Sequence, residues 1–149
     1  MGFFDGVALG GLCGVGMVIK IDNHIMIKDR LKARIGSNTR AEVIGPWILL
    51  TCAKFWGLNY LQVLGDSKVI ISWVLGRAHV KSLELNHWLV STKYVMNDFL
   101  GLSFNHVYRE LNADADLLSK ITLGEMDGKL HYSLFLDDSV VREGHIALF

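Results

Sequence analysis

The sequence predicts an α/β fold in which helices flank both faces of a mixed β-sheet. Three strand-like segments come first and are joined by short turns, which favours an antiparallel start. Helical and strand-like segments then alternate, so the predicted order is β-β-β-α-β-α-α-β-α, with five strands in all. The 149 residues suit one domain, and 51% hydrophobic residues with a single proline are typical of a folded globule.

The first third of the chain predicts strands. The motif "FFD" near the start predicts a short entry strand, and the glycine-rich "GVALGGLCGVG" that follows predicts a turn. The segments "GMVIKI" and "HIMIKDRLKARI" alternate and carry β-branched residues, which predicts two more strands. The second of these has four basic residues spaced two apart, which a strand places on one face: Lys28, Arg30, Lys32 and Arg34.

A buried helix is predicted over 41–56, because this run is apolar nearly all round. The plausible N-caps before it are Ser37, Asn38 and Thr39, and Glu42 then falls in the first turn. Proline inside a helix removes a hydrogen bond and clashes with the preceding turn. We therefore expect a kink or an irregular first turn around Pro46.

The remaining segments complete the predicted order. They are a strand over 58–64, a helix over 67–76, a helix over 83–100, a strand over 102–110 and a helix over 112–124. Asn112 is the expected N-cap of the last helix, and Gly76 and Gly124 are expected to end their helices. Residues 125–149 are acidic and contain the strand-like "LHYSLFL". We interpret them as a C-terminal extension of a domain over 1–124.

Bulk properties narrow the function classes. The net charge is zero, which argues against a protein held to nucleic acid by bulk charge but allows a local patch. No stretch approaches the roughly 20 apolar residues of a membrane helix, so no membrane partner is expected. Cys13 and Cys52 make no disulfide framework and are expected as buried thiols, which fits an intracellular protein, nuclear or cytoplasmic. We expect a monomer.

Four acids stand where predicted elements begin or end: Asp5, Glu42, Asp66 and Asp116. Each alone has a structural explanation, as a helix cap, a first-turn residue or a turn residue before glycine. Asp5, however, follows two phenylalanines on a strand that should be buried, where an unpaired carboxylate is costly. Acids brought close repel one another unless a cation lies between them, and Mg²⁺ or Mn²⁺ prefers oxygen ligands. Two such ions can activate a water and stabilise the leaving oxygen of a phosphodiester.

Four motifs occur in the order seen in ribonuclease H-like domains: "FFDG", "TRAE", "LGDSKVI" and "HVYRELNADADLLSK". Over residues 3–124 the chain resembles the plant retrotransposon-type "reverse transcriptase-like" RNase H family. The resemblance implies a five-stranded mixed sheet with strand order 3-2-1-4-5. It also implies cleavage of the RNA strand of RNA–DNA hybrids, with two Mg²⁺ or Mn²⁺ ions held by four acids.

Carried over by motif, the catalytic and metal-binding acids are Asp5, Glu42, Asp66 and Asp116. Asp114 lies near the last of them, but the spacing from the motif asparagine selects Asp116. Residues two apart on a helix do not share a face, so only one of the two acids should point into the site.

Further residues are candidates for substrate contact: Gly6, Lys28, Arg30, Ser67, Arg109 and Asn112. For Arg109 the alternative is a plain salt bridge with Glu110 or Asp114. For the basic stripe that contains Lys28 and Arg30, the alternative is a solvated sheet face that discourages edge pairing. Ser67 can also cap the helix that follows Asp66.

Three functions are therefore compared. The first is a metal-dependent RNase H-type endonuclease acting on RNA–DNA hybrids. The second is a catalytically impaired nucleic-acid-binding or interaction module with the same fold. It is motivated by the short run before Asp5, by Pro46 one turn after Glu42, and by the neutral net charge. The third is another nuclease of the same fold, such as a 3′–5′ exonuclease.

Overall fold

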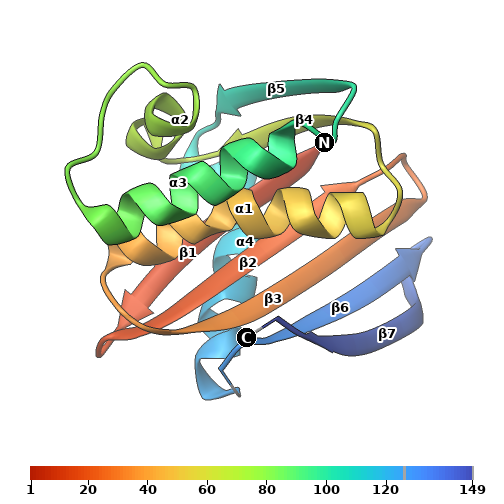
Figure 1. Cartoon of the computed structure of the whole chain (residues 1–149). Coiled ribbons are helices and arrows are strands. Elements are labelled where there is room, and N and C mark those ends of the chain that lie inside the picture. The colour runs from red at the N-terminus through yellow and green to blue at the C-terminus, as the bar shows by residue number, and fades with distance from the viewer. Residues whose placement is uncertain (126, 149) are drawn as a thin grey trace.

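The computed structural model describes residues 1–125 and 127–148, and within them seven strands form one mixed sheet (Figure 1). The strands are β1 Gly2–Leu9, β2 Leu12–Lys20, β3 Ile25–Ile35, β4 Tyr60–Gly65, β5 Gly101–His106, β6 Lys129–Leu136 and β7 Ser139–Ala147. They lie in the order β5-β4-β1-β2-β3-β6-β7. β4 pairs parallel with β1 and β5, whereas all other neighbours are antiparallel.

The first five strands have the predicted order, 3-2-1-4-5, which confirms the fold class. The sheet continues beyond it, because β6 pairs with β3 and β7 pairs with β6. The division of the chain at residue 124 stays a prediction, but residues of the expected extension supply two strands of this sheet. β3 is therefore an inner strand, so the proposal that its basic stripe discourages edge pairing was wrong.

The glycine-rich segment 6–16 is mostly strand, so the predicted long turn was wrong. Only Gly10 and Gly11 form the turn, both with positive φ, at 58° and 82°. β1 is eight residues long and pairs on both sides, with Asp5 opposite Gly16 of β2. The strand that carries Asp5 is thus well anchored.

Helices cover both faces of the sheet, as predicted. α1 (Asn38–Phe55) packs on one face with α3 (Leu83–Met96) beside it, and α4 (Ala113–Ile121) packs on the other (Figure 1). The short α2 (Lys68–Val74) contacts α3 and β5. Two 3₁₀ turns, η1 (Arg109–Asn112) and η2 (Thr122–Gly124), flank α4.

Alternation along β1 separates two apolar cores. Phe4 belongs to the larger core beneath α1, whereas Phe3 belongs to a smaller one beneath α4. Asp5 follows in the same alternation and faces the α4 side.

Both cysteines are free and buried, as expected. No helix among the described residues is long and apolar enough to cross a membrane.

Helix α1 begins earlier than predicted. Ser37 is its N-cap and its hydroxyl accepts a hydrogen bond from the Arg40 amide at 3.1 Å. Glu42 therefore lies in the second turn of the helix and not in the first. The helix is unbroken through Pro46, so the predicted irregular first turn was wrong. Because proline has no N–H, the Glu42 carbonyl lacks its usual partner one turn later.

Candidate active site

One cavity of about 380 Å³ brings the four predicted acids together. Asp5 comes from β1, Glu42 from α1, Asp66 from the end of β4 and Asp116 from α4. The other residues that line it are Gly6, Val7, Asn38, Arg109 and Lys120. Segments up to 111 residues apart in the sequence thus converge on one concave surface, and all four of its acids were predicted for one site.

Asp5 lines this cavity from β1, a strand paired along both edges. Its side chain is buried, and Oδ1 accepts a hydrogen bond from the Gly6 amide at 2.9 Å. A carboxylate so placed is costly unless other groups compensate for it. The strand holds it in position, because β2 pairs with Asp5 itself and β4 pairs with β1 as far as Phe4.

Two glycines let helices approach the sheet closely enough to form the site. A Cβ on Gly6 would lie 2.3 Å from the Ala41 carbonyl carbon, so a side chain there would push away the turn of α1 that carries Glu42. A Cβ on Gly16 would lie 2.2 Å from the Ala115 carbonyl oxygen, next to Asp116 on α4. Glycine at these positions is therefore a packing requirement and not a turn signal.

Burial and neighbouring acids raise the pKa of Asp5 and of Glu42. Burial raises the pKa of Asp5 to about 7, and the neighbouring Asp66 and Asp116 act in the same direction. Burial also raises the pKa of Glu42, again helped by Asp66, while Arg109 opposes the shift. The pKa of Asp5 therefore lies near neutral pH, where a carboxyl group is normally fully ionised.

Asp116 behaves in the opposite way. Burial alone would raise its pKa, but Lys120, Asp5 and Arg109 together lower it. The Lys120 ammonium lies 2.9 Å from Asp116 Oδ2, one helical turn away on α4. The pKa of Asp116 is thus lowered while that of Asp5 is raised, so the two acids of the pair differ in their affinity for a proton.

Three lining residues were not predicted for the site: Val7, Asn38 and Lys120. Lys120 could have been found from its spacing, since positions i and i+4 on a helix are neighbours. Asn38 lines the cavity at the start of α1, and its Oδ1 accepts a hydrogen bond from the Ala8 amide at 2.6 Å. That contact joins residues 30 positions apart, so no local pattern indicates it.

The residues predicted to contact substrate divide into two groups. Gly6 and Arg109 line the cavity. Ser67 instead caps α2, where its hydroxyl accepts from the Ile70 amide at 3.4 Å. Asn112 is buried and donates to the Phe4 carbonyl at 2.8 Å, which ties the start of α4 to β1. It occupies the N-cap position of α4, but its side chain makes no capping hydrogen bond.

The two basic candidates on β3 lie away from the acid cavity. Arg30 forms an ion pair with Glu125 at 2.6 Å. The Lys28 ammonium lies 5.2 Å from the centroid of the Phe135 ring. Neither residue lines the cavity that holds the four acids. A phosphate track along β3 therefore has no support from these contacts.

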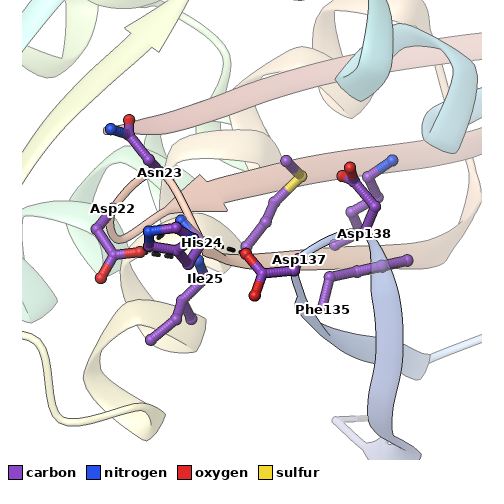
Figure 2. A pocket seen from close by; sticks show the side chains of 9 residues that line it. Asp22, Asn23, His24, Ile25, Phe135, Asp137 and Asp138 are labelled. Carbon is purple, nitrogen blue, oxygen red and sulfur yellow. Dashed lines mark hydrogen bonds and ion pairs between the residues drawn. The ribbon is translucent and has the colours of Figure 1, made fainter.

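A second hollow, of about 260 Å³, lies where the β2–β3 and β6–β7 turns meet (Figure 2). His24 pairs there with Asp137 at 2.6 Å, and both side chains are exposed. Asp22 Oδ1 accepts from the backbone amides of His24 and Ile25, so this acid shapes its own turn. Asp22 and Asp137 therefore have local structural roles in this hollow.

The acid cavity offers the donor set of a hard divalent cation. As placed, no three His, Cys, Asp or Glu side chains among residues 1–125 and 127–148 are close enough to hold a metal ion. The acids nevertheless surround one cavity, and their mutual repulsion raises the pKa of Asp5. Carboxylate oxygens in such a cluster suit Mg²⁺ or Mn²⁺, which would relieve that repulsion. The residues present therefore fit such an ion.

Comparisons with known proteins agree with this fold. A family model described as reverse transcriptase-like matches residues 3–122. No curated protein matches the sequence. RNase H1 from the archaeon Halobacterium salinarum is similar in structure, with a TM-score of 0.78 and 24% identity over 84% of this chain and 97% of that one. The N-terminal RNase H domain of a Mycobacterium tuberculosis protein gives a TM-score of 0.74 and 25% identity, over 80% and 96%.

A third structure is LC11-RNase H1 in complex with an RNA/DNA hybrid. It matches with a TM-score of 0.72 and 23% identity, over 83% of this chain and 95% of that one. The family match covers the segment over which the four motifs were found in the sequence. The chain therefore belongs to the reverse transcriptase-like family and has the fold of ribonuclease H.

Proposed function

We propose that the protein is a metal-dependent endonuclease that hydrolyses the RNA strand of RNA–DNA hybrids. The observation that carries the proposal is the convergence of four acids from four separate segments on one open cavity. Membership of the reverse transcriptase-like family supports this proposed activity, and so does the RNA/DNA hybrid bound to the similar LC11-RNase H1. A cavity that gathers four carboxylates and two basic side chains suits the chemistry of a phosphodiester better than that of an apolar substrate.

Asp5, Glu42, Asp66 and Asp116 would hold Mg²⁺ or Mn²⁺, and their number suits two ions. When bound, such ions activate a water and stabilise the leaving oxygen of a phosphodiester. Below about pH 7, Asp5 would have to release a proton before it could act as a ligand. Asp116 needs no such step, because Lys120 keeps it ionised.

Arg109 and Lys120 are the basic side chains that line the cavity. Arg109 lies near enough to Glu42 and Asp116 to lower the pKa of both acids. A guanidinium at this position can bind a phosphate oxygen of the substrate once the acids are neutralised. We therefore assign to Arg109 the positioning of the substrate phosphate.

A second candidate function is nucleic-acid binding without catalysis. The observation that favours it is the spacing of the acids, since no three among the described residues are close enough to hold a metal ion as placed. Metal titration separates the two functions. If Mg²⁺ or Mn²⁺ stabilises the protein against thermal unfolding, as binding to the native state requires, the endonuclease is favoured. Absence of any stabilisation favours the binding module.

The direct test offers the protein an RNA–DNA hybrid, double-stranded DNA, double-stranded RNA and single-stranded DNA, each with Mg²⁺ or Mn²⁺. We expect cleavage of the RNA strand of the hybrid alone. Asp66→Asn should lose at least about 100-fold in rate, since small displacements in a site already cost that much. Asp138→Asn, at an exposed turn far from the cavity, is the control. Degradation of single-stranded DNA from its 3′ end would instead indicate an exonuclease.

A further inference from the structure

A carboxylate outside the acid cavity lies buried in the larger core. Asp29 lies near the middle of β3, between Ile27 and Leu31 on the face that α1 covers. It is 1% exposed, and neither of its carboxylate oxygens has a hydrogen-bond partner among the described residues. The Cys52 thiol approaches it without reaching hydrogen-bond geometry, although it acts on the pKa of Asp29. Buried polar atoms without partners are rare in proteins, and each needs a reason.

A cavity of about 90 Å³ lies directly beside this carboxylate. The last turns of α1 wall it on one side, with Cys52, Phe55 and Trp56. β6 and β7 wall it on the other, with Tyr132 and Ile146 among the lining residues. The cavity is thus an apolar space with a single carboxylate at its inner end.

The aromatic wall is compatible with a cation. Phe55, Trp56 and Tyr132 pack against one another, with ring centroids 5.5 to 6.2 Å apart. The Arg142 guanidinium already lies over the Trp56 ring, 5.7 Å from its centroid. The negative faces of aromatic rings attract cations, so this wall does not oppose a positive group nearby.

The cavity fixes the chemistry of its occupant. Two oxygens without partners call for at least two N–H or O–H donors at one end of the ligand. The apolar walls call for a hydrocarbon group at the other end. A water-sized group takes about 30 Å³, so a space of about 90 Å³ suits roughly three or four non-hydrogen atoms in all, the donor included. A primary alkylammonium of about this length meets all three requirements, because its three donors stand on one small positive group.

We propose that this cavity is a binding site for a small primary alkylammonium, whose ammonium group bonds Asp29 and whose alkyl group lies between α1 and strands β6 and β7. The site is separate from the acid cavity, so it does not depend on the proposed nuclease function. Nothing in its lining overlaps the residues around Asp5.

The proposal predicts a pH dependence. Burial raises the pKa of Asp29 to about 7, although the Cys52 thiol acts in the opposite direction. The titratable groups that face Asp29 are Cys52 from α1 and Tyr132 from β6, and the charged group nearest the wall is Arg142 of β7. Burial also raises the pKa of the Cys52 thiol, so that group stays neutral. Binding should therefore strengthen as the pH rises through about 7 and Asp29 ionises.

The test titrates n-propylammonium and, as an uncharged control of similar shape, 1-propanol into the full chain by calorimetry. At a pH one unit above the pKa of Asp29 we expect the ammonium to bind at least about tenfold more tightly than the alcohol. At a pH one unit below it the affinity should fall by nearly tenfold, with the ionised fraction of Asp29. Asp29→Asn should remove the preference for the cation, whereas Asp138→Asn should keep it.

A second variant keeps the test decisive if Asp29→Asn does not fold. Ile146→Phe fills the cavity from β7 and leaves Asp29 in place, and it should abolish binding. Equal affinities for the ammonium and the alcohol in the wild-type protein would overturn the proposal. So would binding that survives both variants, or the absence of saturable binding at any pH.

Discussion

The Lys120 ammonium lies 2.9 Å from Asp116 Oδ2, one turn apart on α4 and at the edge of the cavity that holds Asp5. The pair explains why two neighbouring acids of the site differ. Asp116 is kept ionised by the lysine, while burial and the other acids leave Asp5 with a raised pKa. The site therefore carries one acid ready to bind a cation and one that must first release a proton.

The first prediction concerns this ion pair. Lys120→Gln should lower the free energy of unfolding by no more than about 0.5 kcal/mol, because both side chains are partly exposed and water screens the pair. Urea unfolding at low and high salt measures it, and the difference between variant and wild type should shrink at high salt. A loss well above 1 kcal/mol would show that Lys120 supports α4 in a way that this ion pair does not explain.

The second prediction concerns the close approach of α1. Gly6→Ala places a Cβ 2.3 Å from the Ala41 carbonyl carbon, so α1 must shift and carry Glu42 with it. We expect a loss of about 1–3 kcal/mol in the free energy of unfolding, as overpacking typically costs. Cleavage of the hybrid should fall further than the loss of folded protein explains.

Gly124→Ala is the matched control, since nothing lies within 4 Å of the Cβ it would add. It should change neither stability nor cleavage appreciably. If Gly6→Ala behaves like this control, the contact between β1 and α1 does not set the position of Glu42.

The third prediction concerns the pH dependence of stability. Folding raises the pKa of Asp29 from 3.8 to about 7, so the folded state holds a proton that the unfolded chain has already released. Stability therefore falls as the pH rises between these two values, by up to about 4 kcal/mol from this group. Asp5 acts in the same direction. Denaturant unfolding between pH 4 and pH 8 measures the slope.

Asp29→Asn should flatten this slope without removing it, because Asp5 remains, and should make the protein more stable than wild type at pH 8. Asp138→Asn keeps the wild-type slope, because that residue lies at an exposed turn. A variant at position 29 that keeps the full slope would mean that Asp29 is not protonated in the folded protein.

Local patterns in the sequence predicted much of the fold and the four acids that line the cavity. Asp66 follows a predicted strand, and the motif spacing favours Asp116 over Asp114; the structure places Asp116 in the cavity and Asp114 outside it. The alternation of Ile27, Asp29 and Leu31 also indicates that Asp29 is buried, a signal that the sequence contained but that was not used.

Other features depend on contacts between distant segments. Gly6 and Gly16 look like turn residues until the helices that pack on them are known. The pairing of β6 with β3 joins segments about 100 residues apart, so the tail looked like an appendage. Asn112 donates to the Phe4 carbonyl across 108 positions, whereas the sequence indicated a helix cap or a substrate contact.

The most direct test of the central claim compares two acids on α4 that are two residues apart. Asp116 lines the acid cavity, whereas Asp114 is exposed outside it. With Mg²⁺ and an RNA–DNA hybrid, Asp116→Asn should lower the cleavage rate by about 100-fold or more, as expected when a reacting group is misplaced. Asp114→Asn should stay close to wild type. Equal rates for all three proteins, or a complete lack of cleavage by the wild type, would contradict the account.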